Sequence, residues 1–141
     1  MEIVLLVVGE TQDAWIREGI DIYLKRMQHY AKTSIQVVNH RDKQCDAVKS
    51  GDYLVLLDER GTVMNTDQLA QKFQKWMNAG PRRLVFAIGD AYGFAPEFRA
   101  KAQSSIALGP LTFTHDMARV IFMEQCYRCM KILRNEPYHN R

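Results

Sequence analysis

The sequence lacks several features that would assign it to a specialised class of protein. No hydrophobic run approaches the ~20 residues that a membrane-spanning helix needs. The apolar start, MEIVLLVVGE, opens with an acid and is too short for a signal peptide. No internal repeat, low-complexity tract or linker interrupts the 141 residues, a length typical of one domain. We therefore expect a single cytoplasmic domain over residues 1–141, with no membrane partner.

Cysteine is scarce, and the three cysteines present do not form a disulfide framework. Cys126 and Cys129 make a C-x-x-C pair, but it lies deep within an expected helix. A redox pair usually sits at a helix N-terminus, where the thiol pKa is lowered. A structural zinc site needs four ligands, and Cys45 is the only other cysteine. We expect two buried cysteines and no metal; a redox or zinc site is the alternative.

A strong excess of one charge is also missing. Nineteen basic residues against 16 acidic ones give a net charge of +3. A dedicated nucleic-acid binder usually shows a larger basic surplus or patch. If RNA is the partner, its basic contacts must be gathered by the fold or by oligomerisation.

Apolar runs and helical stripes alternate along the chain. Strands are expected at residues 3–8, 34–38, 53–57, 84–88 and 105–108, and helices at 13–30, 66–78, 96–101 and 115–134. Residues 58–61 read as a turn and Thr66 as a helix N-cap, while the polar residues 39–50 fit a short helix or a loop. This alternation predicts an α/β fold with a mostly parallel sheet flanked by helices.

Three segments should meet where ligands bind in such sheets, beyond the carboxyl ends of the strands. They are Leu57-Asp58, the loop Gly89–Gly93, and Leu108–Phe113. The glycines of the second segment match neither a dinucleotide fingerprint nor a P-loop. That loop is therefore either a ligand-binding loop or an ordinary strand-to-helix turn.

The last helix is apolar around most of its circumference, with polar residues confined to a narrow stripe through Glu124, Arg128 and Lys131. A helix of this kind is buried on more than one face. We expect a homodimer built on this helix; the alternative is that a neighbouring helix of the same chain covers it.

His115 and Arg119 lie one turn apart at the start of this helix, directly after Gly109-Pro110. A helix N-terminus favours anions, and an arginine there adds a donor for a phosphate or a carbonyl. The alternative is a capping histidine and a solvated arginine.

The segments LLDERG, FAIGDAYGF and LTFTHDMARVIFMEQCYRCMKILRNEPYHNR, with VVG at Val7–Gly9 and YLKR at Tyr23–Arg26, carry a resemblance. In this order they resemble the RlmH (YbeA-like) family of SPOUT-superfamily 23S rRNA pseudouridine methyltransferases. The likeness covers nearly the whole chain, and its C-terminal part is long and specific.

The resemblance implies a SPOUT-type fold with a C-terminal deep trefoil knot, and a dimer formed around that knot. It implies S-adenosylmethionine as methyl donor and N3 of pseudouridine 1915 in 23S rRNA, within the large subunit or the ribosome, as target. Implied cofactor-binding residues are Leu57, Gly89, Leu108, Gly109, Pro110, Leu111, Thr112 and Phe113.

Loss of the N3 proton needs a base, or groups that stabilise the anion. The candidate catalytic residues are His115, Arg119, Tyr138 and His139. His115 is the preferred base, with a capping role as the alternative. Arg119 and the Tyr138-His139 tail are expected to grip the nucleotide, the tail in the partner's pocket.

Two departures from the family pattern stand out: Asp90 replaces a common glycine, and the segment 39–50 is short. The acid either hydrogen-bonds ribose hydroxyls, lies near the sulfonium or distorts the turn. The competing functions are a SPOUT enzyme for another RNA, such as tRNA, and a non-catalytic dimer that binds nucleotides.

Overall fold

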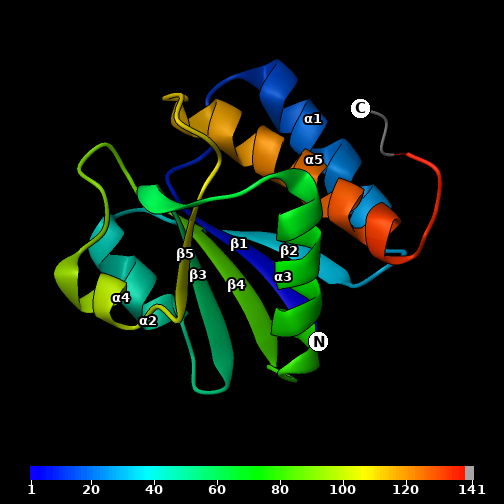
Figure 1. The fold of residues 1–141 in the computed structure, drawn as a ribbon. Helices are drawn as coiled ribbons and strands as arrows, with labels where there is room; N and C mark the ends of the chain where they lie inside the picture. The colour runs from blue at the N-terminus through cyan, green and yellow to red at the C-terminus, as the bar shows by residue number, and fades with distance from the viewer. Residues whose placement is uncertain (139–141) are drawn as a thin grey trace.

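The computed structural model describes residues 1–138 (Figure 1). Its strands are β1 (Glu2–Val8), β2 (Lys32–Val38), β3 (Asp52–Val63), β4 (Arg83–Ile88) and β5 (Ser104–Ala107). Its helices are α1 (Ala14–Met27), the 3-10 turn η1 (Arg41–Lys43), α2 (Gln44–Ala47), α3 (Thr66–Asn78), α4 (Pro96–Ala100) and α5 (His115–Leu133).

The five strands form one sheet in the order β2-β1-β4-β3-β5, and every pairing is parallel. Leu5 in β1 stands opposite Ile35 of β2 and Phe86 of β4. The continuous apolar runs of the sequence follow from this position, because central strands of a parallel sheet are buried on both faces. The expected α/β fold is confirmed, and the sheet is parallel throughout.

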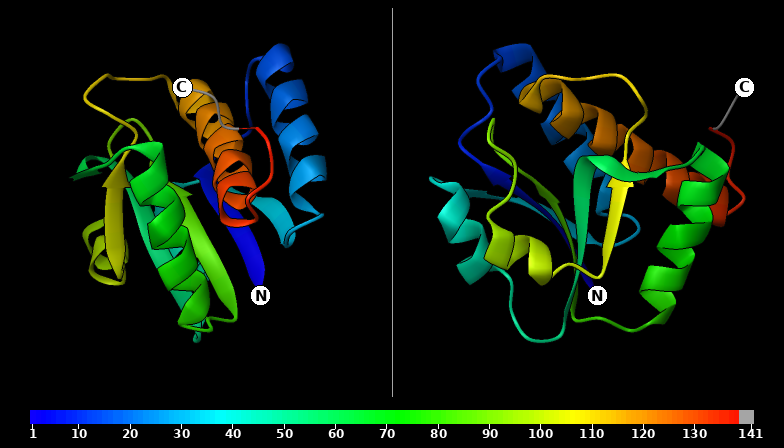
Figure 2. Two further views of the ribbon diagram at one scale, coloured as in Figure 1. Left: turned by 45° about the vertical axis from the view of Figure 1, so that its right-hand side comes forward. Right: turned by 60° about the vertical axis from the view of Figure 1, so that its left-hand side comes forward.

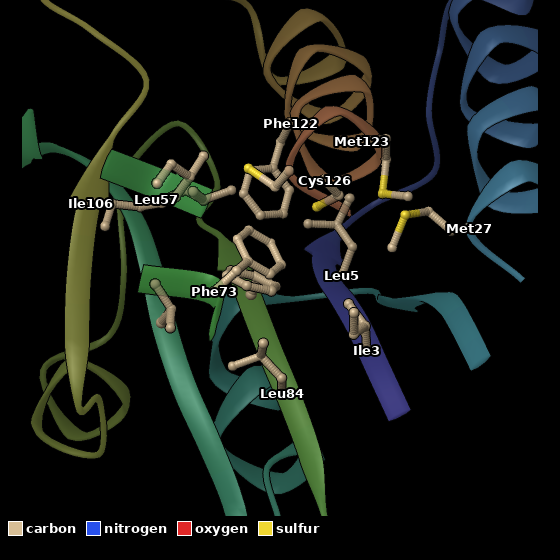
Figure 3. Close-up of a cluster of buried hydrophobic side chains, with 14 of the residues drawn as sticks. Ile3, Leu5, Met27, Leu57, Phe73, Leu84, Ile106, Phe122, Met123 and Cys126 are labelled. Atoms are coloured by element: carbon tan, nitrogen blue, oxygen red, sulfur yellow. The ribbon is translucent and has the colours of Figure 1, made fainter. Parts of the chain in front are cut away.

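Helices cover both faces of the sheet (Figure 2). Alternate residues of β1 point to opposite sides: Ile3 and Leu5 pack under α1, α3 and α5, whereas Val4 and Leu6 pack toward α2 and α4. Figure 3 shows the larger layer, in which Phe122 and Cys126 of α5 lie among side chains from the sheet and from α3.

The end of β3 corrects one expectation. Residues 58–61 form no separate turn; they continue β3, whose pairing with β5 shifts register between Leu57 and Thr62. The two backbones come very close there, because a Cβ on Gly61 would lie 2.5 Å from the carbonyl carbon of Ile106. Glycine is therefore required for this approach.

The start of α3 corrects a second expectation, the identity of the helix N-cap. Asn65, not Thr66, is the N-cap: its side chain accepts a hydrogen bond from the Gln68 amide, and the Gln68 side chain accepts one from the Asn65 amide. This reciprocal capping box satisfies two amides that the helix leaves unpaired. Thr66 is the first helical residue, and its hydroxyl is hydrogen-bonded to Gln125 of α5.

Three sides of α5 are covered by its own chain. Its buried stripe faces the sheet, and α1 and α3 flank it (Figure 2). A Cβ on Gly19 of α1 would lie 3.2 Å from a methyl group of Val120, so glycine lets the two helices pack closely. The flanking helices are the alternative that the sequence left open. One row of α5 side chains is not covered by the sheet, α1 or α3. It runs through Ile121, Glu124 and Arg128, which are only half-buried. Within residues 1–138, no helix is long and apolar enough to cross a membrane.

Candidate functional site

A cleft of about 380 Å³ opens beyond the carboxyl ends of β3, β4 and β5. Its walls come from the three segments that the sequence placed at this edge. The lining residues are Leu57, Asp58, Glu59, Arg60, Ile88, Gly89, Asp90, Ala91, Gly93, Phe94, Arg99, Leu108, Gly109, Leu111, Phe113, His115 and Ala118. The volume is within the range of small-molecule sites.

Apolar side chains of the strand ends and loops sit beside polar groups in this cleft. Asp58 accepts a charged hydrogen bond from Arg99 of α4. Burial alone would raise the pKa of Asp58, but the hydrogen bond from Arg99 and its charge outweigh burial and the pKa is lowered. Asp58 is therefore a fixed anion at neutral pH.

The loop after β4 is held by its own backbone. Asp90 accepts a hydrogen bond from the Tyr92 amide through its side chain and one from the Gly93 amide through its carbonyl. The carboxylate thus closes the turn. A Cβ on Gly89 would lie 2.7 Å from the Gly93 carbonyl oxygen, so this loop folds tightly only with glycine at position 89.

The segment between β5 and α5 forms the opposite wall. Leu108, Gly109, Leu111 and Phe113 line the cleft, whereas Pro110 and Thr112 are exposed and are not among its lining residues. Gly109 has φ +136°, a conformation that favours glycine. Leu111 is 70% exposed and forms an apolar rim at the entrance.

The first residues of α5 divide between the cleft and the interior. His115 lines the cleft, and Thr114, not His115, is the N-cap, accepting a hydrogen bond from the Met117 amide. Arg119 was expected beside His115 but is only 2% exposed. Its guanidinium donates hydrogen bonds to the Val8 carbonyl and the Thr11 hydroxyl.

Asp116 completes this buried network, although it was not among the candidate site residues. Its carboxylate accepts hydrogen bonds from the amides of Gln12 and Asp13, at 2.9 and 2.8 Å. Burial lowers the pKa of the Arg119 guanidinium, and the Asp116 carboxylate opposes this shift. Asp116 and Arg119 thus bind the start of α5 to the loop that follows β1.

Comparison with known proteins decides the family. The family model described as "Predicted SPOUT methyltransferase" matches residues 1–139. The chain belongs to the SPOUT methyltransferase family. It is also 42% identical to ribosomal RNA large subunit methyltransferase H of Geobacter sp. (strain M21), with 99% of each chain covered. The protein of the same name from Christiangramia forsetii is 38% identical, with both chains fully covered.

These relatives confirm the resemblance to the RlmH family on which the sequence interpretation rested. Among solved structures, "a probable methylase family protein from Haemophilus influenzae Rd KW20" is similar, with a TM-score of 0.56 and 13% identity. The match covers 99% of this chain and 70% of that one. At this identity the structural likeness concerns the fold alone.

Tyr138, the last described residue of this SPOUT chain, lies against the last helix of its own chain. Tyr138 donates a hydrogen bond to Glu124, stacks edge-on against Tyr127 and lies under the Arg128 guanidinium. This places Tyr138 beside the middle of α5, more than two turns from His115. His139, the other expected tail residue, lies outside the described residues.

The C-x-x-C pair of the SPOUT chain is part of the hydrophobic core. Cys126 and Cys129 are both buried and unbonded to each other. Burial raises the pKa of the Cys126 thiol well above its ordinary value and that of Cys129 to about 12, so both remain protonated at neutral pH. The part of the chain that the structure describes contains no group of three His, Cys, Asp or Glu side chains arranged to hold a metal.

Proposed function

We propose that this protein is an S-adenosylmethionine-dependent methyltransferase that modifies N3 of pseudouridine 1915 in 23S rRNA of the large ribosomal subunit. The observation that carries the proposal is the cleft: in a SPOUT chain, three strand-end segments enclose it next to the start of α5. The names of full-length relatives support ribosomal RNA as the substrate.

The lining of the cleft fits the methyl donor. Leu57, Ile88, Leu108 and Phe113 supply apolar walls for an adenine ring, while the Asp58 and Glu59 carboxylates can accept from ribose hydroxyls and balance a sulfonium charge. Gly89 leaves room for the Gly93 carbonyl, and Gly109 adopts a backbone conformation that favours glycine. We further propose that residues 108–113 belong to the deep trefoil knot that the family resemblance implies.

The donor, when bound, supplies a methyl group already activated by its sulfonium. The protein then has two tasks: to align the acceptor nitrogen with the methyl carbon, and to remove the N3 proton. His115 in the cleft wall is the group we assign to accept that proton. Asp116 and Arg119 are positioning residues in this scheme, because they fix the helix that carries His115.

We propose that the active form is a cytoplasmic homodimer in which α5 packs against its counterpart. Ile121 is an apolar residue on the open side of α5, outside the hydrophobic core. On α1, Trp15 is 65% exposed and Ile22 lies two turns further along the same face. A second copy would cover these side chains and bring the Tyr138-His139 tail toward the partner's cleft.

The deciding experiment is mass analysis of 23S rRNA from cells that lack the protein. We expect one methyl group to be missing at the pseudouridine and to return on complementation. In parallel, S-adenosylhomocysteine at 100 times its dissociation constant should stabilise the purified protein by about 2.7 kcal/mol. An unchanged rRNA mass with methylation of tRNA instead would make the protein a transfer RNA enzyme. A thermal shift with ATP but not with S-adenosylhomocysteine would indicate a non-catalytic nucleotide binder.

A further inference from the structure

A second cavity, of about 450 Å³, lies at the far end of α5 from the cleft. It is formed where the last turns of α1 and α5 meet the chain after α5. The lining residues are Arg26, His29, Tyr30, Tyr127, Lys131, Arg134 and Glu136. None of them has a role in the proposed methyl transfer.

Basic side chains in this cavity are held in place by aromatic rings. The Lys131 ammonium lies 5.9 Å from the centre of the Tyr30 ring and 5.4 Å from that of Tyr127. Arg134 lies 5.1 Å from the Tyr30 ring, and Arg26 lies 5.5 Å from the Tyr127 ring. Such contacts attract a cation to the ring without neutralising its charge, so all three groups keep their positive charge.

One carboxylate occupies this basic cavity. Asn135 adopts a left-handed conformation (φ 55°) that ends α5 and turns the chain back, which brings Glu136 to the cavity. There the Glu136 carboxylate accepts hydrogen bonds from the Tyr30 hydroxyl at 3.1 Å and from Lys131 at 3.4 Å. Burial would raise the pKa of Glu136, but these hydrogen bonds outweigh it and the pKa is lowered.

The cavity therefore already binds an anionic oxygen group, supplied by its own chain, and keeps a surplus of positive charge. We propose that it is a binding site for a backbone phosphate of the RNA substrate, with Glu136 holding the place of that phosphate in the free protein. The inference rests on the proposed function, which supplies RNA as the partner. A phosphate group offers more anionic oxygens to the lysine and arginine donors than the two oxygens of the Glu136 carboxylate.

The site also explains how a chain with a net charge of only +3 could bind a polyanion such as RNA. Phosphate contacts give sequence-independent affinity and a steep dependence on salt, and they need only a few well-placed cations. Here Arg26 comes from α1, whereas Lys131 and Arg134 come from the end of α5. Two elements far apart in the sequence thus concentrate positive charge that the composition does not show.

The test measures binding of fluorescently labelled protein to ribosomes and to free 23S rRNA from cells that lack the protein, at several salt concentrations. Arg134→Gln should weaken RNA binding several-fold and lower the slope of log affinity against log salt by about 1. Glu136→Gln should act in the opposite direction and tighten RNA binding, because the competing carboxylate is gone. Both variants should keep the wild-type affinity for S-adenosylhomocysteine.

Lys72→Gln is the matched control, since it removes one positive charge from an exposed position on α3. The site is refuted if Arg134→Gln behaves like this control, or if Glu136→Gln fails to tighten binding. If the wild-type protein methylates rRNA and both variants bind RNA as tightly as the wild type, the phosphate site is refuted and the proposed function stands. If the wild-type protein neither binds nor methylates large-subunit RNA, both the phosphate site and the proposed function are refuted.

Discussion

His115 is the residue on which the proposed chemistry depends most. It is the first residue of α5 and lines the cleft, while Thr114 takes the capping role that was its alternative. If His115 accepts the N3 proton, His115→Ala should lower turnover about 100-fold with saturating RNA and leave S-adenosylhomocysteine binding intact. His40→Ala, at an exposed histidine elsewhere, is the control. Near-normal turnover in H115A would end the base assignment.

The tight packing at Gly89 leads to a prediction about binding of the methyl donor rather than about the chemical step. An alanine there would place its Cβ 2.7 Å from the Gly93 carbonyl oxygen, so the loop over the cleft must open. We expect Gly89→Ala to reduce the affinity for S-adenosylhomocysteine at least about tenfold, a difference of about 1.4 kcal/mol, in isothermal titration calorimetry. A melting temperature close to that of the wild type would show that the change is local. Unchanged affinity would mean that this loop does not contact the donor.

Sequence patterns identified the cleft better than they identified which side chains face it. Leu57, Gly89 and Phe113 could be assigned because the carboxyl ends of parallel strands meet at one edge. The direction of Arg119 could not, because spacing alone places it beside His115, whereas Thr11 and Val8 are hydrogen-bond acceptors that draw it inward. Asp116 was missed for the same reason: its partners are backbone amides more than 100 residues away.

At the level of the elements, one ion pair joins the starts of β3 and β4. Asp52 and Arg83 stand opposite each other in the sheet register, and the arginine donates two hydrogen bonds to the carboxylate, at 3.0 and 2.7 Å. The Asp52 side chain is only 1% exposed. Burial raises its pKa, but Arg83 and the Lys49 amide outweigh burial and the pKa is lowered.

Because the folded-state pKa of Asp52 is depressed, its stabilisation is complete above the ordinary aspartate pKa and is lost as pH falls through the folded value. Asp52→Asn should therefore cost about 2 kcal/mol in urea unfolding at pH 7. The difference from wild type should shrink below about pH 4. Asp21→Asn, at an exposed site on α1, is the control and should change little. A difference that persists undiminished at pH 2 would contradict the ion-pair explanation.

Element types were predictable and some element limits were not. Apolar runs located the three central strands, β1, β3 and β4, since a strand buried on both faces needs little else to reveal it. The extension of β3 through residues 58–61 was hidden, because Asp58 and Gly61 are typical turn residues. Only the close passage of β5 beside Gly61 explains their extended conformation.

For the whole molecule, the open row on α5 predicts an oligomer. Ile121 has no place in the core of its own chain, so a charge there should leave the fold intact and disrupt packing between two copies. We expect wild type to sediment as a dimer and Ile121→Arg as a folded monomer with much reduced methylation. Gln71→Arg, at an exposed position on α3, provides a control for the added charge. A wild-type monomer at high concentration would refute the proposed dimer.

The order of strands also has a consequence for how the chain folds. β4 lies between β1 and β3, although it leaves the ribosome after both of them. Until residue 88 is available, β1 has only β2 as a neighbour, and the apolar strand Leu54–Leu57 has no partner on either side. Pairings between distant segments slow folding. The nascent chain therefore exposes an unpaired apolar strand while residues 64–88 are synthesised, and β1 and β3 become parts of one sheet only when β4 is inserted between them.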